Sequence, residues 1–114
     1  MIYTSYFANR DIHNAGLRLV AVSLSVPRGF HCERYNALAP TRELINIAHY
    51  GKIDEYTKLY SEQVLSHLDP LKVYRELDGS ILLCWEKAGK FCHRRLIADW
   101  LAKATGLDVK ELGT

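Results

Sequence analysis

Four short segments of the chain are rich in apolar, β-branched and aromatic residues, and polar or glycine-containing stretches separate them. They cover residues 2–7, 18–24, 81–85 and 108–112. The first three contain few polar positions, and strands of this kind are buried on both faces, as in a parallel or mixed sheet covered by helices. The pattern predicts four strands of a small, mainly parallel sheet.

The chain between the second and third predicted strands has helical periodicity. Thr41 is a suitable N-cap for a helix that Gly51 ends, and Asp54 is expected to cap a longer helix. Apolar residues on that longer helix recur at helical spacing, so it should lay a face rich in tyrosine against the sheet. Asp69 followed by Pro70 predicts the start of a third helix, which runs to about residue 77.

A last helix is predicted over residues 92–105, ended by Gly106. Its inward stripe continues backwards to His93, whereas Arg95 falls in line with solvent-facing positions one and two turns later. His93 and Arg94 are therefore better candidates for a pocket than Arg95. Strands that alternate with helices predict an α/β fold, a single three-layer Rossmann-like domain over residues 1–114. The expected inward stripe comprises Leu96, Ile97, Trp100, Leu101 and Ala104.

Composition narrows the class of protein. A net charge of +2 is too small for a general nucleic-acid or membrane binder, and no apolar run reaches the roughly 18 residues that span a bilayer. The first residues lack the basic and apolar regions of an export signal, so we expect a cytoplasmic protein without membrane contact. Three cysteines, an odd number, fit free thiols in a reducing compartment, and no structural disulfide is expected.

Polar residues gather where the predicted strands end, and parallel strands end at the same edge of a sheet. Asn9 and Arg10 follow the first strand, and a Ser- and Arg-containing segment at 23–29 follows the second. Glu86 and Lys87 follow the third, just before a Cys-His-Arg-Arg turn at 92–95 that should begin the last helix. Cations at a helix N-terminus favour an anion. The predicted anion-binding residues are Arg28, Lys87, His93 and Arg94.

Two residues are candidates for catalysis. Cys92 lies at a predicted helix N-terminus next to an imidazole and two guanidinium groups, surroundings that lower a thiol pKa and favour a nucleophilic thiolate. Glu86 is the one carboxylate among the cations of the predicted site, and it is the second candidate. Cys84 lies within an apolar strand and is more typical of a core residue. Zinc binding by Cys84, Cys92 and His93 is the competing use of the same atoms, although no CxxC or HExxH spacing supports it.

Several motifs resemble those of the DUF488 family, including its YeaO-like branch. They are VPRG at 26–29, LAPTREL at 38–44, LLCWEK at 82–87 and FCHRRLIADWL at 91–101, and they cover nearly the whole chain in order. The resemblance implies a compact α/β domain, found in bacteria and phages, with polar residues gathered around the Cys-His-Arg-Arg turn. It implies no activity or cofactor.

The sequence therefore predicts a site for a phosphorylated ligand, a nucleotide or a nucleic-acid end, at the start of the last helix. Cys92 or Glu86 would lie close to the reacting atoms. The alternative from another class is a non-enzymatic protein-interaction module, such as a phage or bacterial modulator of a host factor. The sequence leaves the cofactor, the oligomeric state and whether the protein is an enzyme open.

Overall fold

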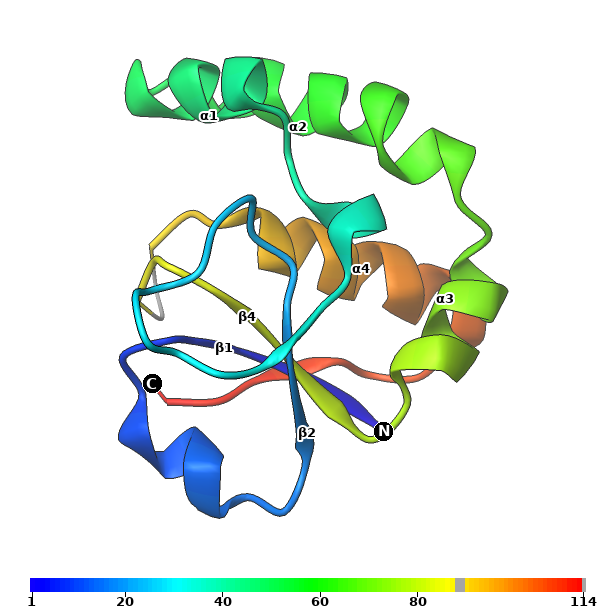
Figure 1. The fold of residues 1–114 in the computed structure, drawn as a ribbon. Helices are drawn as coiled ribbons and strands as arrows, with labels where there is room; N and C mark the ends of the chain where they lie inside the picture. Colours follow the sequence, from blue (N-terminus) through cyan, green and yellow to red (C-terminus); the bar gives the residue numbers. More distant parts are fainter. Residues whose placement is uncertain (88–89, 114) are drawn as a thin grey trace.

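A computed structural model describes residues 1–87 and 90–113 of the chain (Figure 1). The predicted α/β class is confirmed: the centre is a five-stranded sheet in the order β3-β2-β4-β1-β5, and every neighbouring pair is parallel. Charged Glu33–Arg34 forms an edge strand that the apolar pattern did not predict. The strands are β1 (Ile2–Tyr6), β2 (Arg18–Ala21), β3 (Glu33–Arg34), β4 (Ser80–Cys84) and β5 (Lys110–Glu111).

Strand β4 is the centre of the sheet and pairs along its length with β1, from Ile2 opposite Ser80 to Tyr6 opposite Cys84. All five residues of β4 are buried. Its side chains alternate between two apolar clusters, with Leu82 in one and Ile81 and Leu83 in the other. Burial on both faces explains why the sequence of this strand is almost continuously apolar.

Four α-helices are present in the described part of the chain, and their caps follow the sequence signals. Thr41 accepts a hydrogen bond from the Leu44 N–H, Asp69 accepts one from the Leu71 N–H, and Gly106 ends the last helix with φ 73°. Asp54 lies in the first turn of its helix, after the N-cap Lys52. The helices are α1 (Arg42–His49), α2 (Ile53–Gln63), α3 (Pro70–Leu77) and α4 (His93–Thr105).

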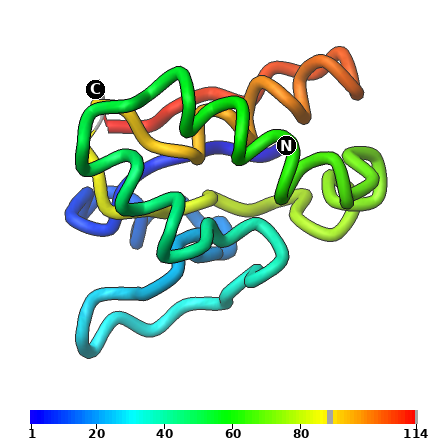
Figure 2. The backbone as a smooth tube through the Cα atoms, turned by 90° about the horizontal axis from the view of Figure 1, so that it is seen from above, coloured from blue at the N-terminus to red at the C-terminus, as the bar shows by residue number. Residues whose placement is uncertain are grey.

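The two faces of the sheet are covered differently. Buried or partly buried side chains from all four α-helices contribute to one core cluster. On the other face the cover comes from the 3-10 helix η1 (Arg10–Asn14), through Ile12, and from loop residues including Val26 and Phe30. The three layers are thus an α-helical layer, the sheet, and a layer of 3-10 helix and loops. Figure 2 shows α1 and α2, in green, in front of the strands when seen from above.

Helix α4 is rotated relative to the predicted orientation. Its buried side chains beyond the first turn are Ile97, Ala98 and Leu101, whereas Ala104 is exposed. Both His93 and Arg94 are consequently buried at its start. Over residues 1–87 and 90–113, no helix combines the length and apolar character that crossing a bilayer requires.

Candidate functional site

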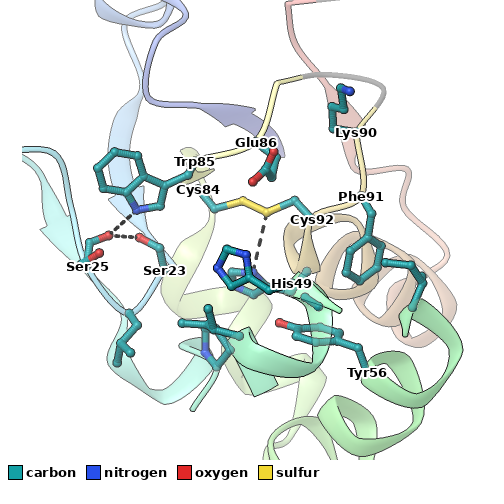
Figure 3. Close-up of a pocket in the computed structure, with 16 residues that line it drawn as sticks. Ser23, Ser25, His49, Tyr56, Cys84, Trp85, Glu86, Lys90, Phe91 and Cys92 are labelled. Atoms are coloured by element: carbon teal, nitrogen blue, oxygen red, sulfur yellow. Dashed lines mark hydrogen bonds between the residues drawn. A yellow bond between two sulfur atoms is a disulfide. The ribbon is translucent and has the colours of Figure 1, made fainter. Parts of the chain in front are cut away.

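A cleft of about 510 Å³ lies over the carboxyl ends of β2 and β4, where the first turn of α4 meets the α1–α2 pair (Figure 3). Ser23 and Ser25 line it from the loop after β2, and Trp85 and Glu86 line it after β4. The end of α1 and the start of α2 form the opposite wall. The predicted convergence of strand ends therefore produces a cleft with Cys92 in its lining.

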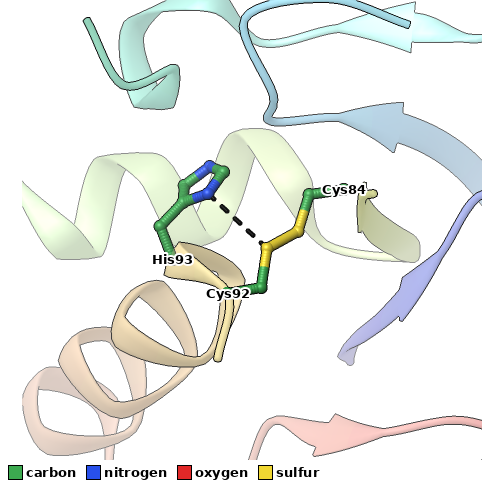
Figure 4. Close-up of side chains that lie close together, drawn as sticks. All are labelled: Cys84, Cys92 and His93. Atoms are coloured by element: carbon green, nitrogen blue, oxygen red, sulfur yellow. Dashed lines mark hydrogen bonds between the residues drawn. A yellow bond between two sulfur atoms is a disulfide. The ribbon is translucent and has the colours of Figure 1, made fainter. Parts of the chain in front are cut away.

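Cys84 and Cys92 are joined by a disulfide, so the expectation of free thiols at these positions is wrong (Figure 4). Cys84 is the last residue of β4 and Cys92 is the N-cap of α4, and both residues line the cleft. Cys32 is a free thiol that packs against the apolar cluster on the other face of the sheet. The odd number of cysteines did not exclude a disulfide, because one bonded pair and one free thiol also add up to three.

His93 is held by one backbone hydrogen bond and by ring packing. Its Nε2 lies 2.7 Å from the Val22 carbonyl oxygen, and because a carbonyl only accepts, this nitrogen carries the proton. The Nδ1 then presents a lone pair and lies 3.7 Å from the Cys92 sulfur. Burial, and to a smaller extent the charge of Arg94, lower the pKa of His93, while the bond to Val22 opposes them, and the net result is a pKa of about 4. The ring is therefore neutral near pH 7.

Arg94, the next residue, points to the other side of the helix. It is fully buried and makes a bidentate ion pair with Glu111, in which Nη2 lies 2.6 Å from Oε2. Its Nη1 donates to the Cys84 sulfur at 3.0 Å. Burial raises the pKa of Glu111, but hydrogen bonds from Arg94 and Thr4 and the nearby arginine charges outweigh it and hold the pKa below its ordinary value.

Arg95 belongs to the same polar network instead of the predicted solvent-facing row. Its Nη1 donates to Thr4 Oγ1 at 2.9 Å and to the Val109 carbonyl at 3.0 Å. Thr4 in turn donates to Glu111 Oε1 at 2.5 Å. The arginines of the turn thus tie α4 to β1 and β5, and neither of them lines the cleft.

The structure brings together only some of the residues predicted to form the site. Cys92, His93 and the exposed Glu86 all line the cleft. Arg28 and Lys87 are exposed and lie outside the cleft lining, and Arg94 is engaged by Glu111. The four predicted anion-binding residues therefore lie in three different places: the cleft, the exposed surface and a buried ion pair.

Sequence reasoning missed the wall formed by α1 and α2. His49, Ile53 and Tyr56 line the cleft from these helices, and Lys90 and Phe91 line it from the segment before α4. Tyr56 belongs to the tyrosine-rich face expected to pack against the sheet; it is 3% exposed, and its ring packs edge-on against Phe91. The only available signal was the break at Gly51 that turns α2 back along α1.

The fold and the site define a class: a parallel α/β domain that carries a cysteine pair and a neutral histidine in a partly apolar cleft at the carboxyl ends of its strands. A family model described as the active DUF488-N3 subclade matches residues 2–105. The chain belongs to the DUF488 family, as the motifs indicated. No curated protein and no solved structure matches it.

Proposed function

We propose that the cleft over Cys92 binds a phosphorylated ligand, a nucleotide or a nucleic-acid end, and places it next to Cys92 and Glu86. The observation that carries this proposal is the lining of the cleft: Trp85 at one end, Tyr56 and Phe91 at the other, and Lys90 just before the N-terminus of a 13-residue helix. A second hollow, of about 470 Å³ near Met1 and Tyr74, is lined by neither cysteine nor histidine. The family description includes the word active but names no reaction.

The flanking aromatic side chains suit a planar heterocycle. Trp85 is 52% exposed, and its Nε1 donates to the Ser25 carbonyl at 3.0 Å, which holds the indole at one end of the cleft. Tyr56 and Phe91 lie at the other end, as Figure 3 shows. Stacking of a base on an aromatic side chain contributes about 1–3 kcal/mol and tolerates any base. An exposed indole fixed at the rim is therefore a suitable platform for a base.

The charges near the cleft suit a phosphate at its α4 end. The first N–H groups of a helix have no partner within the helix, and the Cys92 side chain makes no capping hydrogen bond to them. Lys90 lies in the lining just before this helix. We assign the anion to Lys90 and the α4 N-terminus, with the exposed Lys87 and Arg28 acting from outside the cleft. His93 contributes as a neutral ring and Arg94 through its hold on Cys84.

Equilibrium titration followed by tryptophan fluorescence tests this proposal. Nucleoside monophosphates and 5′-phosphorylated dinucleotides should saturate the protein at low salt, whereas the matched unphosphorylated compounds should bind at least about tenfold more weakly. Lys90→Ala should remove most of that difference. Lys103→Ala, at an exposed position in the last turn of α4, is the matched control. Absence of saturation, or equal affinity for both members of each pair, contradicts the proposal.

A second candidate, a protein-interaction module, is favoured by one observation. Leu24, Ile53 and Trp85 line the cleft and are all at least 36% exposed, so the rim presents apolar surface to water. An apolar peptide side chain would fit the same cleft without needing Lys90. Trp85→Ala would weaken either occupant, whereas Lys90→Ala weakens only the phosphorylated one. The pair of variants therefore separates the two functions.

The predicted cytoplasmic location bears on the state of the site. A reducing compartment would keep Cys84 and Cys92 as thiols. The titrations should therefore be run with and without a phosphine reductant. Binding in both states is expected, because Lys90 and Trp85 take no part in the disulfide.

A further inference from the structure

We propose that, once the disulfide is reduced, Cys84, Cys92 and His93 form a three-ligand site for a soft divalent metal, Zn²⁺, with the fourth coordination position facing the cleft. The ligand atoms of these three residues all lie within 4.8 Å of one another. This site goes beyond ligand binding at the cleft and does not depend on it.

The spacing of the atoms matches a tetrahedral metal. Zn–S bonds of about 2.3 Å and Zn–N bonds of about 2.0 Å place neighbouring ligand atoms roughly 3.4–3.8 Å apart. The distance from His93 Nδ1 to the Cys92 sulfur is 3.7 Å in the structure. The Cα atoms of Cys84 and Cys92 are 7.2 Å apart, so side-chain rotation alone can separate the sulfurs after reduction.

The histidine is already in the form that a metal requires. Its Nε2–H donates to the Val22 carbonyl at 2.7 Å, which leaves the Nδ1 lone pair directed towards the sulfurs. Metal-binding histidines almost always donate their other N–H to a carbonyl or carboxylate, because this fixes the tautomer and the ring orientation. The Tyr60 ring packs edge-on against the imidazole at 5.4 Å and fixes it further.

Charge also favours the site. The Arg94 Nη1 lies 3.0 Å from the Cys84 sulfur, so a thiolate at Cys84 has a buried cation beside it. Two thiolates neutralise one divalent ion, and Glu111 balances Arg94. Sulfur ligands select soft ions over Mg²⁺ or Ca²⁺.

The position of the three residues indicates an open site. Each of them lines the cleft, so a metal bound there would have its remaining coordination position on the side that a ligand or water can reach. Two cysteines and one histidine with an open fourth position are a known catalytic zinc arrangement. Glu86 would be the carboxylate that lines the same cleft.

Oxidation state decides whether the metal binds, because the disulfide uses the same sulfurs. A phosphine reduces the bond with one water: two thiols form and the phosphine becomes its oxide. Zn²⁺ then displaces one proton from each thiol and accepts the Nδ1 lone pair. Closing the disulfide again requires an oxidant that removes two electrons and releases the ion.

Cobalt titration of the full chain tests this inference without any nucleotide. Phosphine-reduced, chelator-treated protein should bind one Co²⁺ per chain, with a thiolate-to-cobalt charge-transfer band and tetrahedral visible bands that Zn²⁺ abolishes. The same protein oxidised with diamide should show neither. This comparison needs no substitution, so it cannot fail through misfolding. Reduced protein with three titratable thiols but no charge-transfer band overturns the proposal.

Substitutions then locate the metal. Cys84→Ser and Cys92→Ser should each remove about half of the charge-transfer intensity, since one thiolate remains. His93→Gln should weaken Co²⁺ binding by at least about tenfold. Cys32→Ser and His31→Gln are the matched controls, and circular dichroism checks that each variant folds. A band that disappears in Cys32→Ser but survives in Cys92→Ser places the metal elsewhere and refutes the inference.

Discussion

His93 and Arg94 are neighbours in the first turn of α4, yet they belong to two different regions of the molecule. His93 lines the cleft with an acceptor nitrogen directed at a sulfur atom. Arg94 lies on the side of β1 and β5, where Glu111 and Cys84 accept its hydrogen bonds. Consecutive residues of a helix point about 100° apart, so a run of four polar residues cannot all serve one pocket. The side of α4 that carries His93 can contact a ligand in the cleft, whereas the side that carries Arg94 holds α4 against β5.

The largest expected loss of stability comes from breaking the ion pair between Arg94 and Glu111. Arg94→Met leaves the Glu111 carboxylate partly buried without its partner, and removing one member of a buried pair destabilises by about 3–5 kcal/mol. Arg18→Ala removes the exposed ion pair with Glu33 and should cost about 1 kcal/mol or less. Urea unfolding measures both. Equal losses in the two variants would show that Arg94 is not a structural residue.

The two regions should lose their contributions to the free energy of unfolding in different pH ranges. In the disulfide-bonded protein the pKa of His93 is about 4, against an ordinary 6.5. The unfolded chain therefore binds a proton in this range that the folded protein does not, and the free energy of unfolding falls as pH drops from 6.5 to about 4. The shift corresponds to a loss of about 3 kcal/mol. Glu111 acts lower: its pKa lies below 4.5, so its ion pair persists above that pH and is lost as pH falls further.

Unfolding measured across this pH range tests both windows. His93→Gln should flatten the upper part of the profile, and Glu111→Gln should flatten only the lower part. His31→Gln, at an exposed histidine, is the control. A profile for His93→Gln with the slope of the wild type between pH 6.5 and about 4 would contradict the buried neutral ring.

The fold was largely predictable because its signals are local. Thr41, Asp69 and Gly106 cap their helices through atoms a few residues away, so spacing alone identifies them. Strand β4 is apolar throughout because both of its faces are buried, which indicated a parallel sheet. Strand β3 was missed because its two residues, Glu33 and Arg34, are charged and exposed.

The site was predictable only in part, because its geometry depends on distant segments. Glu111 reaches Arg94 through the pairing of β5 with β1, more than a hundred residues apart in sequence. The disulfide depends on how close the end of β4 lies to the start of α4, a distance that spacing in the sequence does not give. The α1–α2 wall depends on tertiary packing of helices whose sequences only show an apolar face. Spacing along the chain indicated that Cys92, His93 and Glu86 lie near one strand end, but it could not show that Glu111 holds Arg94 outside the cleft.

The smallest loss of stability among these predictions is expected for Tyr60, which packs behind His93. The Tyr60 hydroxyl donates to the Leu38 carbonyl at 2.6 Å, and both groups are buried. Tyr60→Phe keeps the ring that packs against His93 but leaves this carbonyl unpaired, so it should destabilise by about 1–2 kcal/mol.

The matched variant is Tyr35→Phe, whose hydroxyl donates to Glu76 at 2.7 Å in an exposed position. Water can replace that bond, so its loss should be well below about 1 kcal/mol. Because Tyr60→Phe retains the aromatic contact, cobalt binding by the reduced protein should change less than it does in His93→Gln. A larger loss of cobalt affinity in Tyr60→Phe would mean that the hydrogen bond to Leu38, rather than ring packing, positions the imidazole. The position of His93 in the cleft would then depend on a buried polar contact behind it, just as the position of Arg94 depends on Glu111.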